Sequence, residues 1–177
     1  MDTKALQLTP TLCADDLLAI AELYIEAFPA VERRPMRAMV GLLSRDECHF
    51  HRIMRGDDTV GLMHLWDLPT VCLCEHFAVQ PDLRGHGIGE WAMHQVMAST
   101  PKPIVVEVEP PTSSITARRI QFYERLGFSI LTEHYLQPPY DASLPPVPLY
   151  LMSSKGLGPN AASDVASSIH RIVYGRD

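Results

Sequence analysis

Three glycines, Gly85, Gly87 and Gly89, occur where a helix is about to begin, in the stretch HFAVQPDLRGHGIGEWAMHQV, residues 76–96. A glycine inside a helix costs about 1 kcal/mol of stability relative to alanine. The turn must therefore need backbone that carries no side chains. An apolar run precedes the glycines and an apolar-faced helical pattern follows them, which predicts a strand, a glycine loop and a helix in direct succession.

A glycine loop that opens a helix is suited to bind phosphate. The first N–H groups of a helix have no partner within it and carry partial positive charge. Arg84 adds a fixed charge with several donors. The P-loop requires Gly-Lys-Ser/Thr, which the sequence lacks, and the dinucleotide fingerprint requires a third glycine where Glu90 stands. Glu107 and Glu109 lie near the distance expected of a ribose-binding acid, but a single βαβ unit argues against that fold.

The remaining pattern is R-x-x-G-x-G, formed by Arg84, Gly87 and Gly89 between the strand EHFAV and an apolar-faced helix. The segment FYERLGF, residues 122–128, follows downstream. In this order the two segments resemble the acetyl-CoA loop and the second hallmark of the GNAT superfamily of N-acetyltransferases. The resemblance covers roughly residues 3–153. It implies acetyl-CoA as the donor and direct attack by an amine in a ternary complex.

The predicted elements form a mixed α/β order without regular alternation, which argues against a doubly wound sheet. The resemblance implies a GNAT-like fold, with a central, mostly antiparallel mixed sheet splayed between the fourth and fifth strands and helices on both faces. Strands are expected at residues 5–9, 48–56, 59–67, 70–79, 102–109, 129–136 and 149–153. Helices are expected at residues 14–28, 35–44, 90–99 and 113–128.

Residues 3–153 are predicted to form the transferase domain, and residues 154–177 a linker and an amphipathic helix. In that helix Val165, Ile169, Ile172 and Val173 form a narrow apolar stripe, with Ser163 or Asp164 as the N-cap. The stripe predicts docking onto the main core or onto a partner subunit.

The resemblance assigns cofactor contacts residue by residue. The backbone of the strand before the loop would pair with the pantetheine arm, and the loop would hold the diphosphate. Many members carry an Asn seven residues before the hallmark tyrosine, where this chain has Thr116, whose hydroxyl still donates one bond. The implied contacts are Phe77, Ala78, Val79, Arg84, Gly85, His86, Gly87, Ile88, Gly89 and Thr116.

Amide formation requires an amine without its extra proton and a protonated or stabilised thiolate. Glu75, just ahead of the cofactor strand residues, occupies a position that many members use for the base; the alternative is a strand glutamate paired with an arginine. Tyr123 matches the tyrosine assigned as general acid in many relatives; the alternative is an aromatic that packs the helix on the sheet.

Candidate acceptor residues are less specific. Glu107 and Glu109 share one strand face, where they would receive a cationic substrate or pair with Arg118 or Arg119. The loop that holds Glu32 and Arg33 and the loop near Tyr135 commonly line the acceptor site in the superfamily. No metal site is expected, because Cys72, Cys74 and His76 on one strand are more typical of core residues.

Composition bounds the setting and the partners. A net charge of −6 argues against nucleic-acid binding, and no apolar run reaches the length of a membrane span. The four cysteines form no disulfide pattern and the first residues form no signal peptide, so a cytoplasmic protein is expected. A small-molecule primary amine is the favoured acceptor and a homodimer is an open expectation. The alternatives are a peptide N-acetyltransferase, an acyl-CoA sensor without turnover and an adaptor that binds no CoA.

Overall fold

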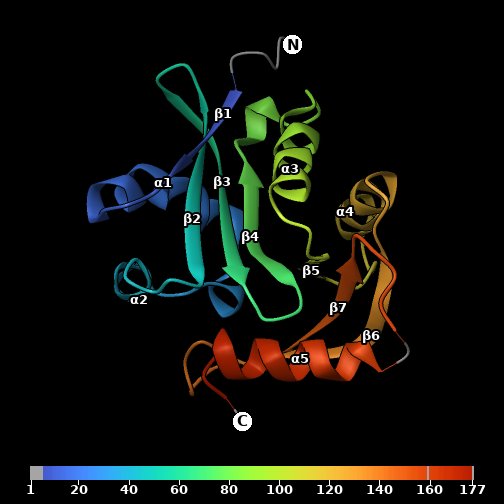
Figure 1. The fold of residues 1–177 in the computed structure, drawn as a ribbon. Coiled ribbons are helices and arrows are strands. Elements are labelled where there is room, and N and C mark those ends of the chain that lie inside the picture. Colours follow the sequence, from blue (N-terminus) through green and yellow to red (C-terminus); the bar gives the residue numbers. More distant parts are fainter. Residues whose placement is uncertain (1–5, 159, 177) are drawn as a thin grey trace. The chain divides into compact units, whose positions relative to one another are not determined.

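The computed structural model describes residues 6–158 and 160–176, and they fall into two compact units (Figure 1). The first unit contains the described residues up to Asp67 together with Glu75–Pro101. The second contains Leu68–Cys74 and the described residues from Lys102 onward. Strand β4 (Cys72–Val79) contributes its first three residues to the second unit and the remainder to the first.

The first unit is an antiparallel sheet with helices. Strands β1 (Leu6–Pro10), β2 (Cys48–Arg55) and β3 (Asp58–Asp67) pair in sequence, with Leu6 opposite Arg55 and Cys48 opposite Trp66. The tight β2–β3 hairpin turns at Gly56, whose φ is +59°. The helical segments of this unit are α1 (Ala14–Ala27), η2 (Ala30–Glu32), α2 (Met36–Leu42), η3 (Pro81–Leu83) and α3 (Ile88–Ser99).

The second unit is a mixed sheet. Strand β5 (Ile104–Val108) runs parallel to the start of β4, with Cys72 opposite Ile104 and Cys74 opposite Val106. Strand β7 (Val147–Ser153) pairs antiparallel with both β5 and β6 (Ser129–Gln137). The unit also holds α4 (Ser114–Arg125) and α5 (Ala161–Ile172).

The hydrogen-bonded strand order β1-β2-β3-β4-β5-β7-β6 gives one mostly antiparallel sheet in which β4 and β5 are the parallel pair. This confirms the predicted fold class. The parallel pairing covers three residues of β4, from Cys72 to Cys74, and β4 continues to Val79.

A backbone contact explains one glycine of the first unit. Gly61 on β3 lies opposite Ile53, beside the register shift between Ile53 and Met54 of β2. A Cβ built on Gly61 would lie 2.7 Å from the backbone oxygen of Ala78 and 2.8 Å from Cδ1 of Ile53. Strands β3 and β4 therefore approach so closely that only glycine fits here.

Two helix starts differ from the predictions. Helix α3 begins at Ile88 rather than at residue 90, so Gly89 lies in its first turn. Helix α5 begins at Ala161 with Asn160 as N-cap, so the predicted caps Ser163 and Asp164 are wrong.

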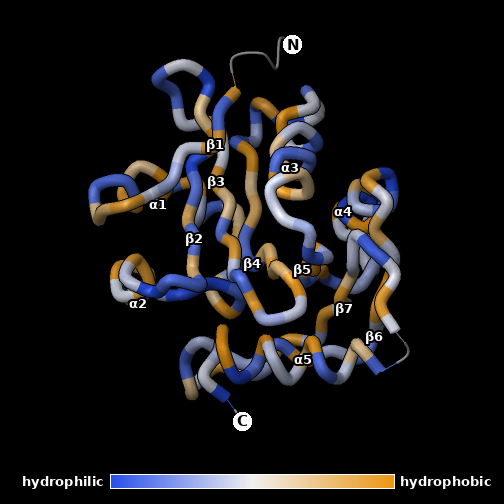
Figure 2. The backbone as a smooth tube through the Cα atoms, viewed as in Figure 1, coloured by the Kyte–Doolittle hydropathy of each residue, from blue (hydrophilic) through white to orange (hydrophobic). Residues whose placement is uncertain are grey.

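Helix α5 buries one face. Its hydropathy alternates along the helix (Figure 2), and Val165, Ile169 and Val173 are buried. The ring of His170 on α5 lies 3.0 Å, at Nε2, from the backbone oxygen of Leu136 on β6, which ties α5 to the sheet of its own unit. None of the helices within the described residues is long and apolar enough to cross a membrane.

Candidate active site

The glycine loop leaves the start of α3 open to solvent. Gly85 and Gly87 have φ of +78° and +80°, a left-handed conformation that L side chains rarely adopt. A Cβ built on either glycine would meet no atom within 4 Å. Gly87 is the N-cap of α3, and no side chain caps the helix there. The loop thus presents the first amides of α3 without side chains above them, as a phosphate site requires.

The residues around these glycines hold the loop in place. The guanidinium of Arg84 donates from Nε to the backbone oxygen of Val79 at 3.0 Å, and its side chain remains exposed. Ile88 is buried and anchors the start of α3, whereas His86 is exposed. The first intrahelical bond runs from the Trp91 amide to the Gly87 oxygen at 2.9 Å.

Along the strand that leads into the loop, the backbone N–H and C=O groups point alternately toward β3 and away from it. The Ala78 carbonyl faces Gly61 of β3, and the Gln80 amide donates to the Val60 oxygen at 3.0 Å. Because backbone groups alternate along a strand, those of Phe77 and Val79 point to the opposite edge. Of the three predicted pantetheine contacts, the structure thus directs Phe77 and Val79 away from β3 and Ala78 toward it.

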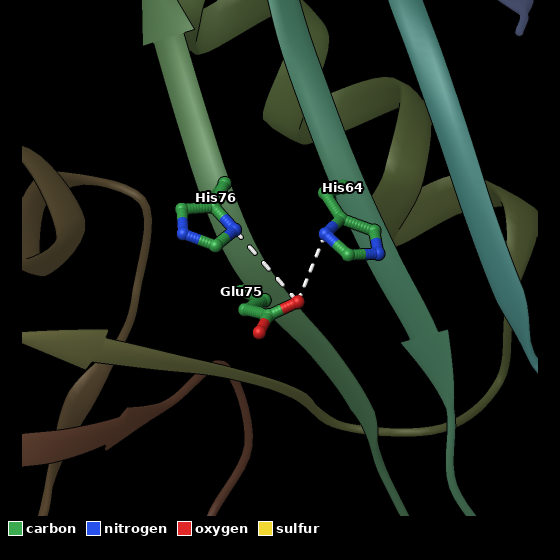
Figure 3. Close-up of side chains that lie close together, drawn as sticks. All are labelled: His64, Glu75 and His76. Atoms are coloured by element: carbon green, nitrogen blue, oxygen red, sulfur yellow. Dashed lines mark ion pairs between the residues drawn. The ribbon is translucent and has the colours of Figure 1, made fainter. Parts of the chain in front are cut away.

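Glu75 lies at the centre of a buried polar cluster (Figure 3), and its side chain is fully inaccessible to solvent. Oxygen Oε1 accepts hydrogen bonds from Arg34, at 3.1 Å from Nε and 2.9 Å from Nη2. Oxygen Oε2 accepts from Nε1 of Trp66 at 2.7 Å. The same Oε2 lies 2.8 Å from Nδ1 of His64 and 3.7 Å from Nδ1 of His76.

In this cluster the pKa shifts keep the Glu75 carboxylate charged and the imidazoles of His64 and His76 neutral. Burial by itself would raise the pKa of Glu75, but Arg34 and the two histidines outweigh it, and the pKa lies well below its ordinary value. Burial lowers the pKa of His76 to about 4 against the opposing effect of Glu75, and it lowers the pKa of His64 as well. At neutral pH the cluster therefore consists of one ion pair and two uncharged rings.

This cluster also docks the segment between α1 and α2. The Arg34 amide donates to the hydroxyl of Tyr24 at 2.8 Å, and Nε2 of His76 donates to the backbone oxygen of Glu32 at 3.0 Å. Arg33 donates to the backbone oxygens of Ile25 at 2.7 Å and of Phe28 at 3.2 Å, near the end of α1. Of the predicted acceptor residues in this segment, Glu32 thus contributes a backbone anchor and the Arg33 side chain binds helix carbonyls.

Sequence reasoning did not place Arg34, His64 or Trp66 beside Glu75. An arginine partner for Glu75 was one of the two alternatives weighed, but its identity required the fold, because Arg34 lies 41 positions away in sequence.

The donor set of this cluster has the composition of a metal site. One ligand atom each from His64, Glu75 and His76 lie within 4.8 Å of one another. Both carboxylate oxygens, however, already accept hydrogen bonds, one from the Arg34 guanidinium and the other from the Trp66 indole. A guanidinium directly beside the carboxylate opposes a dication at the same place. The arrangement therefore favours a network of hydrogen bonds and an ion pair over a bound metal ion.

In the second unit, Tyr123 lies on α4 with its ring buried against Phe122 and Phe128, at ring-centre distances of 5.1 and 5.3 Å. Burial raises the pKa of Tyr123, and Cys74 adds to the rise. Among the described residues, its hydroxyl has no hydrogen-bond partner. The ring is therefore fixed by packing, while its O–H group donates no hydrogen bond to the described residues.

Thr116, at the start of the same helix, has its hydroxyl engaged locally. It forms a capping box with Ser113: the Thr116 amide donates to Oγ of Ser113 at 3.2 Å, and the Ser113 amide donates to Oγ1 of Thr116 at 3.0 Å. The Thr116 hydroxyl also lies 3.2 Å from the Ser113 carbonyl. The Thr116 hydroxyl, a predicted cofactor contact, thus serves as part of a helix cap.

The structure gives different partners to Glu107, on β5, and Glu109, just after it. Glu109 forms a salt bridge with Arg119, which was one of the alternatives weighed. Glu107 instead accepts a hydrogen bond from the hydroxyl of Tyr135 at 2.5 Å and another from the hydroxyl of Tyr174 at 3.0 Å. Glu107 and Tyr135, predicted separately, thus form one cluster, and no sequence pattern indicated that Tyr174 belongs to it.

Comparison with known proteins agrees with this geometry. Residues 46–130 match the family model of the acetyltransferase (GNAT) domain. A solved structure of a GNAT-family acetyltransferase from Bacteroides thetaiotaomicron shares 31% identity and a TM-score of 0.87, over 97% of this chain and 99% of that one. This chain belongs to the GNAT family of acetyltransferases. No curated protein sequence matches it.

More distant GNAT-like structures share the fold alone. An acetyltransferase from Thermus thermophilus is 14% identical with a TM-score of 0.65, over 86% of this chain and 98% of that one. The ribosomal-protein-S18-alanine N-acetyltransferase from Escherichia coli is 16% identical with a TM-score of 0.64, over 88% and 97%.

Proposed function

We propose that this GNAT-family protein transfers an acetyl group from acetyl-CoA to a primary amine, with a small molecule as the favoured acceptor. The observation that carries the proposal is the exposed loop at the start of α3, where two left-handed glycines leave the helix amides uncovered. Backbone amides bind a diphosphate well in such a loop, and Arg84 adds a positive charge. When bound, acetyl-CoA would supply an activated acetyl thioester.

The chain's own residues would perform three tasks. The amides of α3 and the guanidinium of Arg84 would bind phosphate, and the outward backbone of Phe77 would orient the pantetheine arm. The Tyr123 hydroxyl would donate a proton to the departing sulfur as the new C–N bond forms and the C–S bond breaks. The amine would attack in its neutral form, after its extra proton has passed to solvent. Solvent would then take up the second proton that the nitrogen releases as the amide forms, and would return one proton to Tyr123.

In this proposal Glu75 does not act as the general base that the sequence predicts. A carboxylate with a pKa held well below its ordinary value takes up a proton weakly at neutral pH. The same carboxylate holds Arg34, and with it the segment between α1 and α2. We therefore propose Glu75 as a positioning residue.

The activity is tested by following free thiol while the protein is mixed with acetyl-CoA and a panel of primary amines. We expect thiol release above background with at least one amine. Tyr123→Phe should lower kcat roughly tenfold, which is less than the hundredfold or more typical of a general acid, because a thiol is a fair leaving group. CoA affinity should remain unchanged in that variant. Tight CoA binding without thiol release for any amine would contradict turnover and favour an acyl-CoA sensor.

A further inference from the structure

A second polar cluster surrounds Glu107 in the second unit. Oxygen Oε2 accepts from the Tyr174 hydroxyl at 3.0 Å, and Nε2 of Gln137 lies 3.4 Å from it. Nε2 of Gln137 also donates to the Tyr174 hydroxyl at 2.8 Å. The carboxylate belongs to β5, Gln137 ends β6, and Tyr174 follows α5, so three segments meet at one half-buried charge.

The amide of Gln137 shows that this cluster is incomplete. Its nitrogen faces the Glu107 carboxylate and the Tyr174 oxygen, so a reversed amide would direct oxygen at oxygen. The other end, Oε1, is buried and has no hydrogen-bond partner among the described residues, and Gln137 is only 4% exposed. A buried acceptor without a donor is costly, which points to a group absent from the ligand-free chain.

The geometry points to a binding site for the primary ammonium group of the acceptor, formed by Glu107, Gln137 and Tyr174. This inference rests on the proposed function and narrows its substrate class to cationic primary amines. A primary ammonium carries three N–H donors and no acceptor. The ammonium would donate hydrogen bonds to the Glu107 carboxylate and to Oε1 of Gln137. The amide nitrogen of the same Gln137 side chain already faces that carboxylate.

Tyrosine hydroxyls complete the match to a cation with N–H donors. Tyr140 and Tyr174 lie with ring centres 5.2 Å apart and their hydroxyls 3.3 Å apart, and the Tyr135 hydroxyl bonds Glu107. A hydroxyl oxygen can accept a hydrogen bond from an ammonium ion. A quaternary ammonium has no N–H for Oε1 of Gln137, and an anionic acceptor would be repelled by Glu107. The site therefore selects both for charge and for donors.

The site is tested by NMR titration of the ¹⁵N-labelled protein with n-butylamine, which is an ammonium ion at pH 7. Tetramethylammonium and n-butanol serve as comparison ligands, and each series is run with and without CoA. We expect saturable shifts at the amides of Glu107, Gln137 and Tyr174, with a Kd of about 1–10 mM. Tetramethylammonium and butanol should bind at least tenfold more weakly.

Two variants and one matched control separate binding from a purely structural role. Glu107→Gln still accepts the tyrosine hydroxyl bonds but loses the charge, and should weaken butylammonium binding at least tenfold. Gln137→Met removes Oε1 at similar volume and should weaken it several-fold. Glu133→Gln, the same change at an exposed position of β6, should leave the Kd unchanged.

Absence of saturable shifts in the wild type, with and without CoA, would overturn the inference. So would equal affinity of Glu107→Gln, or tetramethylammonium binding as tightly as butylammonium. If Gln137→Met fails to fold, the wild-type ligand series still decides. Because binding is read without turnover, a positive result here with no CoA binding would overturn the proposed function alone, and CoA-dependent thiol release with no ammonium binding would overturn this site alone.

Discussion

At the scale of single residues, the Glu75 carboxylate shows how burial and charge set a role that residue type leaves open. A strand glutamate ahead of the glycine loop fits a general base, and it equally fits an ion pair. The structure places the charge of Arg34 at 2.9 Å with no solvent access to the carboxylate. Electrostatics of this kind favour a fixed anion that organises its neighbours.

Glu75→Gln separates the two roles through the pH dependence of the reaction. As a positioning residue, Glu75 should support kcat/KM by a constant factor, so the variant should lose activity while its pH–rate profile keeps its shape. If Glu75 were instead the general base, its removal would abolish the rise of rate with pH. Unfolding should also become easier by about 3 kcal/mol, because Arg34 loses its buried partner. Glu47→Gln, at the more accessible pair with Arg45, should change the free energy of unfolding much less.

The buried histidines predict a loss of stability in mild acid. The folded-state pKa of His76, about 4, lies below its unfolded value near 6.5, so the unfolded chain binds the proton first. The stabilisation is complete above about pH 6.5 and should be lost as pH falls toward about 4. Between these pH values the free energy of unfolding should decrease less in His76→Gln than in the wild type, by up to a few kcal/mol. Urea titration at several pH values measures this difference. An unchanged slope would show that His76 does not titrate as inferred.

At the scale of elements, the close approach of β3 to β4 supports the strand that leads into the glycine loop. Gly61→Ala would bring a Cβ within 2.7 Å of the Ala78 oxygen and should destabilise the fold by about 1–3 kcal/mol. Gly41→Ala on α2, where nothing lies within 4 Å, should stabilise by up to about 1 kcal/mol. Thermal unfolding of both variants measures this difference, and equal shifts would contradict the close packing.

Local sequence signals predicted most elements, and the misses follow from what such signals omit. Strands of alternating or β-branched residues were located to within a few positions. The start of α3 was placed too late because glycine is a poor helix former, whereas Gly89 tolerates the first turn under an N-cap at Gly87. Asn160 was missed as the N-cap of α5 because its side chain forms no capping bond.

The candidate site was predictable only where it is local in sequence. The loop from Arg84 to Gly89 is contiguous, so its pattern was visible before the fold. The contacts of Glu75 with Arg34 and His64 join separate elements, and those of Glu107 with Tyr174 span 67 positions. Pairing at such separations is set by topology, which composition and periodicity do not encode.

At the scale of the whole molecule, membership of the GNAT family and the exposed glycine loop carry the functional account together. The family match supports acetyl transfer in general terms. The proposed use of acetyl-CoA depends on whether the amides at the start of α3 bind a diphosphate.

Calorimetric titration of CoA into the protein tests this claim most directly. Gly87→Glu places bulk and negative charge where the phosphate would lie. Gly56→Glu is the matched control, because Gly56 also has a left-handed φ and open space, but in the β2–β3 turn. We predict that the wild type and Gly56→Glu bind CoA and that folded Gly87→Glu loses at least a hundredfold in affinity, about 2.7 kcal/mol. Equal CoA affinity in all three proteins, or no CoA binding by the wild type, would contradict the account.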